Sequence, residues 1–112
     1  MNCISNKENP DYRNTIKEAI SAVEATIRVI TGESTFGDAL KKLEHKGLTI
    51  NNQLKESFSK VYNYTNDKKA GIRHAVVGEH ESPDYETAKY LLVTSSAFIN
   101  YLIGLSVKNN LL

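Results

Sequence analysis

Residues 90–107 read YLLVTSSAFINYLIGLSV, and none of these eighteen residues is charged. Lys89 precedes the stretch and Lys108 follows it, so its length approaches the roughly 20 residues of a membrane-spanning helix. Serine, threonine, asparagine and tyrosine residues interrupt its apolarity, which is more typical of a helix buried on several sides. We therefore expect the core helix of a soluble protein that has no membrane segment.

A second patterned stretch lies near the N-terminus. Apolar residues recur there every three or four positions, with charged and polar residues between them. This spacing predicts a long helix with one apolar stripe, and Gly32 is expected to end it. The stripe consists of Tyr12, Ile16, Ile20, Val23, Ile27 and Ile30.

Two shorter helices are expected between the long ones. Thr35 and Asp38 have the spacing of a capping box for a helix that ends at Gly47, and a further helix is predicted over residues 51–64. Their inward-facing residues are Leu40 and Leu43 in the first and Leu54, Phe58, Val61 and Tyr62 in the second.

The two long helices are predicted to start in the same way, because residues 9–12 read NPDY and residues 82–85 read SPDY. Asn9 and Ser82 are expected to be the N-caps, with proline at the first helical position. The last helix is predicted to run to about Lys108. Its main stripe is Tyr85, Ala88, Leu92, Ser95, Ile99, Leu102 and Leu105, widened by Leu91, Phe98 and Tyr101.

These patterns predict an all-α fold, an up-and-down four-helix bundle with two long antiparallel helices and two shorter ones. No convincing alternating strand pattern occurs. We expect a polar N-terminal tail over residues 1–9 and a single helical domain over residues 10–108.

Composition narrows the class of protein. The chain has 112 residues and a formal net charge of +1, so any nucleic-acid contact must rest on a local patch. The single cysteine, Cys3, cannot form an internal disulfide, and no signal peptide is visible. The chain has no CxxC or HExxH pattern for zinc, so we expect no cofactor. Because nothing in its cysteine content requires an oxidising compartment, we expect a cytoplasmic location.

Titratable side chains concentrate between the third and fourth predicted helices, where Arg73, His74 and His80 occur together. An imidazole can take a proton from a ribose 2′-hydroxyl or give one to a leaving 5′-oxygen. A guanidinium stabilises the charge that a phosphoryl group gains in the transition state. The cluster is thus a candidate site for metal-independent RNA cleavage, and Lys68 and Lys69 can contact phosphates.

The residues alone also allow a plainer interpretation, in which the arginine and the histidines are solvated or cap helix ends. His45 is interpreted as an exposed residue of a last helical turn. Glu24, beside the first stripe, is interpreted as a surface ion pair or as a residue that orients the cluster. The last helix keeps apolar residues beyond its core stripe, which predicts a two-fold homodimer.

At these residues the sequence resembles the HEPN superfamily, and most closely the HEPN-like C-terminal domain of bacterial abortive-infection proteins. The family signature is an arginine, a polar residue, and a histidine after four to six intervening residues, which Arg73, His74 and His80 match. The other similar stretches are residues 11–24, 62–66, 71–75 and 96–102.

The resemblance implies a four-helix core that dimerises, with the two signatures facing each other. It also implies metal-independent endoribonuclease activity of the kind used in toxin–antitoxin and anti-phage defence systems. An antitoxin or a second domain of a longer protein is then a possible partner. Because other members have lost activity, the main alternative is a non-catalytic dimerisation or partner-binding module. A third interpretation is a small nucleotide-binding module, since relatives in the superfamily have been linked to nucleotides.

Overall fold

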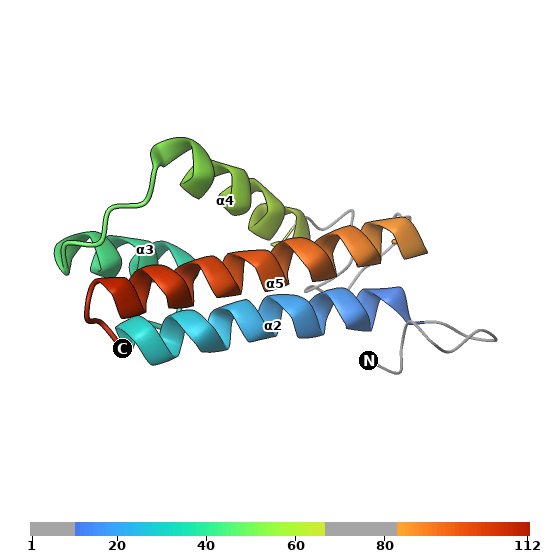
Figure 1. Ribbon diagram of the computed structural model, residues 1–112. Helices are drawn as coiled ribbons and strands as arrows, with labels where there is room; N and C mark the ends of the chain where they lie inside the picture. The colour runs from blue at the N-terminus through green and yellow to red at the C-terminus, as the bar shows by residue number, and fades with distance from the viewer. Residues whose placement is uncertain (1–10, 67–82) are drawn as a thin grey trace.

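The computed structural model describes residues 11–66 and 83–112 and contains four α-helices (Figure 1). They are α2 (Tyr12–Thr31), α3 (Phe36–His45), α4 (Asn52–Asn66) and α5 (Tyr85–Lys108). Helix accounts for 80% of these residues and none of them is in a strand. The prediction of an all-helical protein is therefore confirmed.

The long helices begin later than the sequence predicted, because aspartate caps both of them. The Asp11 carboxylate accepts a hydrogen bond from the Asn14 backbone N–H at 2.9 Å, and Asp84 accepts one from the Thr87 N–H at 2.8 Å. A carboxylate satisfies a free N–H of the first turn and also interacts favourably with the helix dipole. The predicted caps Asn9 and Ser82 are therefore wrong, and Pro83 precedes the cap of α5.

The predicted C-terminal ends of α2 and α3 and the predicted N-cap of α3 are confirmed. Gly32 follows α2 with φ of 77°, in the left-handed region, and its N–H bonds the Arg28 carbonyl at 2.8 Å. Thr35 caps α3, where its hydroxyl accepts a hydrogen bond from the Asp38 N–H at 3.2 Å. Gly47, also at positive φ, follows the last turn of α3.

A matched pair of glycine substitutions tests whether Gly32 ends α2 through its positive φ. Gly32→Ala is expected to destabilise the protein by about 1 kcal/mol, because alanine is strained at positive φ. Gly37, inside α3, is helical, and a methyl group added there would meet no atom within 4 Å. Gly37→Ala should therefore stabilise by up to about 1 kcal/mol. Urea unfolding measures the free energy of unfolding of both variants, which should change in opposite directions. Equal changes would contradict the role of Gly32 at the end of α2.

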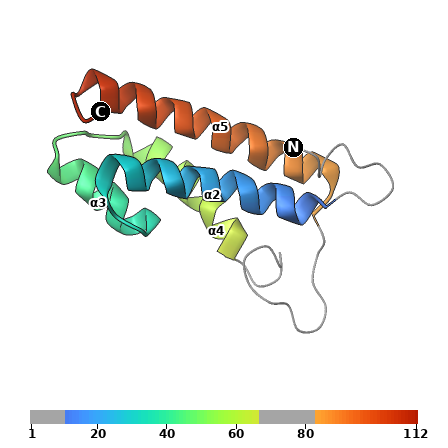
Figure 2. The ribbon, with the colours of Figure 1, turned by 90° about the horizontal axis from the view of Figure 1, so that it is seen from below.

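The two long helices run parallel, so the predicted antiparallel arrangement is wrong (Figures 1 and 2). Tyr12 and Tyr85, their first residues, make an edge-to-face ring contact with centroids 6.1 Å apart. The long helices are parallel because α3 is short and lies beside the C-terminal part of α2. Helix α4 alone makes the return, from the Lys55–Glu44 ion pair beside α3 to the first turns of the long helices.

The core lies between α2 and α5 and is closed by α3 and α4. The predicted stripe of α2 is buried from Ile16 to Ile30, and Tyr12 is partly buried. On α5 the buried face is rotated relative to the prediction, because Leu91 and Phe98 are buried while Leu92 and Ile99 are only partly buried. Rings from three helices fill the centre, namely Phe36, Phe58, Tyr62 and Phe98.

The polar residues of α5 divide between core and surface. Ser95 and Ser106 are 1% and 0% exposed, and neither hydroxyl has a hydrogen-bond partner in the described part of the protein. Ser96 and Asn100 are exposed. The two buried hydroxyls are therefore unpaired within the described residues, whereas Ser96 and Asn100 face outward.

Candidate functional site

The sequence-predicted catalytic cluster lies outside the described residues. This applies to Arg73, His74 and His80, and also to Lys68 and Lys69. His45 is described and is exposed at the end of α3, as expected. The helices on either side of residues 67–82 are described, so the end of α4 and the start of α5 are known.

Helix α4 ends beside the N-terminal half of α2 and α5, and α5 begins beside the first residue of α2 (Figure 1). Thr65, in the last turn of α4, is fully buried and its hydroxyl donates to the Tyr62 carbonyl at 2.6 Å. Tyr64 packs against the small cluster around Ile16 and Leu91. These contacts fix the last turn of α4, which directly precedes the residues of the cluster in the sequence.

Asp84 marks the other flank, where the chain enters α5. The Thr87 backbone N–H donates to its carboxylate, and this hydrogen bond lowers the pKa of Asp84 below its ordinary value. The cap is thus ionised at neutral pH and strengthens the start of α5.

A partly buried polar pair links α4 to α2. The Tyr62 hydroxyl donates a hydrogen bond to Glu24 Oε2 at 2.8 Å. The Tyr62 ring stacks on Phe36 with centroids 4.8 Å apart and an interplanar angle of 15°. This stacking orients the phenol, so the Glu24 carboxylate is tied to the core through Tyr62.

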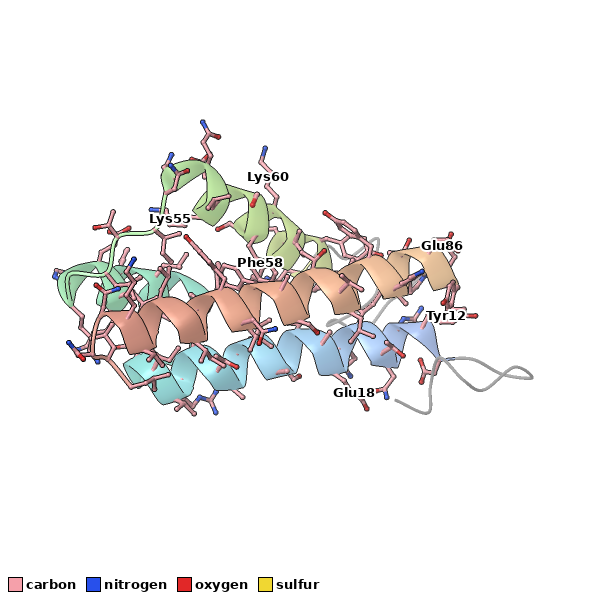
Figure 3. All side chains as sticks on the ribbon, in the orientation of Figure 1. Tyr12, Glu18, Lys55, Phe58, Lys60 and Glu86 are labelled. Atoms are coloured by element: carbon pink, nitrogen blue, oxygen red, sulfur yellow. The ribbon has the colours of Figure 1, made fainter. Side chains whose placement is uncertain are left out.

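A hollow between α4 and α5 is the feature that sequence reasoning missed. It has a volume of about 300 Å³, and its floor includes Phe58 and Phe98, whose rings stack with centroids 4.0 Å apart. In Figure 3 Phe58 points from α4 toward α5, whereas Lys60 points away. The lining residues are Leu54, Ser57, Phe58, Val61, Tyr90, Thr94, Ala97, Phe98 and Tyr101. We call this hollow the α4/α5 groove.

Leu54 shows why the groove was not predicted. The sequence placed Leu54 on the inward side of its helix, but it is 51% exposed at the edge of the groove. Periodicity gives the side of the helix on which a residue lies, and it does not show whether the neighbouring helix comes close enough to cover it. The only available signal was the excess of apolar residues on α5.

A metal centre and a membrane segment are two further possibilities. Within residues 11–66 and 83–112, no group of three histidine, cysteine or acidic side chains is placed to hold a metal ion. In the same part of the chain, α5 is long and apolar enough to cross a membrane by length and composition. Only 28% of that stretch is buried, so much of α5 faces outward.

Comparison with known proteins yields no relative: no family model, no curated protein and no solved structure matches this chain.

Proposed function

We propose that this protein is a metal-independent endoribonuclease of the bacterial toxin or anti-phage type, acting in the cytoplasm as a homodimer. The observation that carries the proposal is the sequence cluster of Arg73, His74 and His80, which matches the signature of the HEPN superfamily. The helices support it indirectly, because the cluster lies in the connection between the packed end of α4 and the capped start of α5.

The proposed reaction needs one proton acceptor, one proton donor and one fixed positive charge. His80 removes the proton of a ribose 2′-hydroxyl, and the 2′-oxygen attacks the adjacent phosphorus. The bond from phosphorus to the 5′-oxygen breaks, and the partner's His80 gives that oxygen a proton. Arg73 stabilises the charge on the phosphoryl oxygens, His74 shapes the site, and Lys68 and Lys69 contact the RNA backbone.

Cleavage in the presence of EDTA tests the chemistry. Purified protein is incubated with a broad RNA panel with and without EDTA, and the new ends are analysed by mass spectrometry. We expect equal rates in both conditions, with 2′,3′-cyclic phosphate or 3′-phosphate ends and 5′-hydroxyl ends. Cleavage that EDTA abolishes would refute the mechanism, and an uncut panel would count against ribonuclease activity.

The second candidate is a non-catalytic partner-binding module, and the α4/α5 groove favours it. Binding sites are typically concave and mostly apolar, and this groove has both properties. Its occupant would be an antitoxin or a second domain of a longer protein. An uncut RNA panel together with tight binding of such a partner, lost in Phe58→Ala, would establish this alternative.

A further inference from the structure

The floor of the α4/α5 groove is part of the hydrophobic core and is held rigidly. Phe58 and Phe98 are only 3% and 8% exposed, and their rings stack with centroids 4.0 Å apart. Both rings also contact Phe36, with centroid distances of 5.8 and 6.0 Å. A ligand that enters the groove therefore meets a surface that is already ordered, so its binding costs little side-chain freedom.

The two edges of the groove expose large apolar side chains to water. Leu54, on α4, is 51% exposed, and Tyr90, on α5, is 59% exposed. In Figure 3 Phe58 points from α4 toward α5, and both helices contribute to the lining. An occupant between the edges would remove both exposed side chains from water, which favours an apolar occupant.

The charge of the lining restricts the ligand further. None of the nine lining residues is charged, so a charged group on the ligand would be desolvated without an ion-pair partner in the lining. The floor rings lie parallel, at an interplanar angle of 2°, and each covers one face of the other that could attract a cation. The lining therefore favours a neutral ligand, and it disfavours nucleotides, whose phosphates need positively charged or N–H donors.

Aromatic rings and hydroxyl groups make up most of the lining. Four of the nine residues are aromatic and four carry a hydroxyl group. Aromatic side chains pair favourably with another ring in edge-to-face or offset arrangements. The Ser57 hydroxyl already donates to the Leu54 carbonyl at 2.8 Å and keeps its capacity to accept. A mostly apolar lining with a few polar groups is typical of a small-molecule site.

The volume of the groove limits the size of the occupant. An α-helix is about 10 Å across and rises about 5.4 Å per turn, so a single turn takes up roughly 400 Å³. The groove has only about 300 Å³ and therefore cannot accommodate a partner's helix. Its volume lies at the lower end of the range for small-molecule pockets, about 300–1,000 Å³.

We propose that the α4/α5 groove binds a small, neutral, planar aromatic molecule, seated on the Phe58–Phe98 floor between Leu54 and Tyr90. The floor supplies a rigid apolar surface, the edges gain from being covered, and the lining hydroxyls orient a polar group of the ligand. This binding site goes beyond the proposed function and does not depend on RNA cleavage.

A matched set of naphthalene probes tests the chemistry of the ligand. At pH 7, 2-naphthol is neutral, 2-naphthoate is an anion and 2-naphthylmethylamine is a cation, while all three share one ring system. We expect 2-naphthol to bind with a dissociation constant of about 10–100 µM, and each ion to bind at least about tenfold more weakly. Isothermal titration calorimetry gives the constants. No binding of 2-naphthol at about 1 mM, or equal affinity for a charged probe, would overturn the proposal.

Two adjacent residues of α5 test the location of the site. Ala97 is an exposed residue of the lining, whereas Ser96 is exposed and does not belong to it. Ala97→Leu would fill part of the groove, so we expect 2-naphthol to bind at least about tenfold more weakly. Ser96→Leu is the matched control and should leave the affinity unchanged. Since both positions are exposed, both variants should keep their helices, which circular dichroism checks.

Tyr90 and Val93 provide a second matched pair. Each is 59% exposed on α5, and only Tyr90 lines the groove. Tyr90→Ala removes one edge of the groove, and we expect the affinity for 2-naphthol to fall by about three- to tenfold. Val93→Ala should have no effect. Equal effects of the two changes, or no effect of Ala97→Leu, would mean that the probe binds elsewhere and would refute the proposal.

The outcomes separate this site from both candidate functions. If 2-naphthol binds, Ala97→Leu weakens it and no RNA is cut, the ligand site stands and only the ribonuclease proposal fails. If 2-naphthol does not bind and Ala97→Leu instead abolishes binding of a partner protein, the groove belongs to the partner-binding module. That result would refute the small-molecule site.

Discussion

Replacing His80 with alanine is expected to lower the rate of RNA cleavage by about 10²–10⁴-fold, because the site loses its general acid and base. Arg73→Ala should lower the rate by about 10²–10³-fold, since the transition state loses a fixed positive charge. Rates are measured on a cut RNA substrate under single-turnover conditions, so that chemistry and not product release is followed.

Histidine and arginine substitutions elsewhere in the chain show whether the loss of cleavage is specific to the cluster. His45→Ala and Arg28→Ala remove the same side chains from exposed positions on α3 and α2, and both should leave the rate unchanged. Arg73→Lys should restore activity only in part, because lysine lacks the planar fork that binds two phosphoryl oxygens. His74→Ala should have a smaller effect than His80→Ala if His74 only shapes the site.

One result would refute the assignment of Arg73 and His80. If the double variant Arg73→Ala, His80→Ala cuts RNA as fast as the wild type, cleavage comes from another site or from a contaminant. Circular dichroism and sedimentation of each variant show whether a loss of activity reflects the chemistry. An intact helical dimer that has lost cleavage would support the assignment.

Local sequence signals predicted most of the helices and their ends. The stripe of α2 was predictable because a single apolar face with polar residues around it has one possible orientation. Gly32 and Thr35 were predictable because positive φ and N-capping are properties of a few residue types. These features depend on neighbours within about four residues, so no knowledge of the tertiary fold is needed.

Features that depend on neighbouring helices were not predictable. The order of four helices suggested that α2 and α5 are antiparallel. The direction of α5, however, depends on how much of the length of the bundle α3 spans. The α4/α5 groove depends in the same way on how closely α4 approaches α5. The Arg73, His74 and His80 cluster came from residue types and a family resemblance alone, so its geometry was not fixed by any helical pattern.

The sequence was also ambiguous about which face of α5 is buried. This orientation can be tested by substitution. Apolar residues surround this helix, so periodicity does not define one buried face. The sequence favoured Leu92 as a core residue and Leu91 as a flanking one. In the structure Leu91 is 3% exposed and packs with Ile16 and Ala88, while Leu92 is only partly buried.

The same substitution at the two adjacent leucines is therefore expected to have unequal effects. Leu91→Ala should lower the free energy of unfolding by about 2–5 kcal/mol, because it leaves a cavity among buried side chains. Leu92→Ala should cost at least about 1 kcal/mol less, since part of its surface is already in water. Helix propensity changes identically in both variants and cancels from the comparison. Urea unfolding at one fixed protein concentration measures the difference, and a larger loss for Leu92→Ala would show that α5 is rotated toward the face first predicted from its sequence.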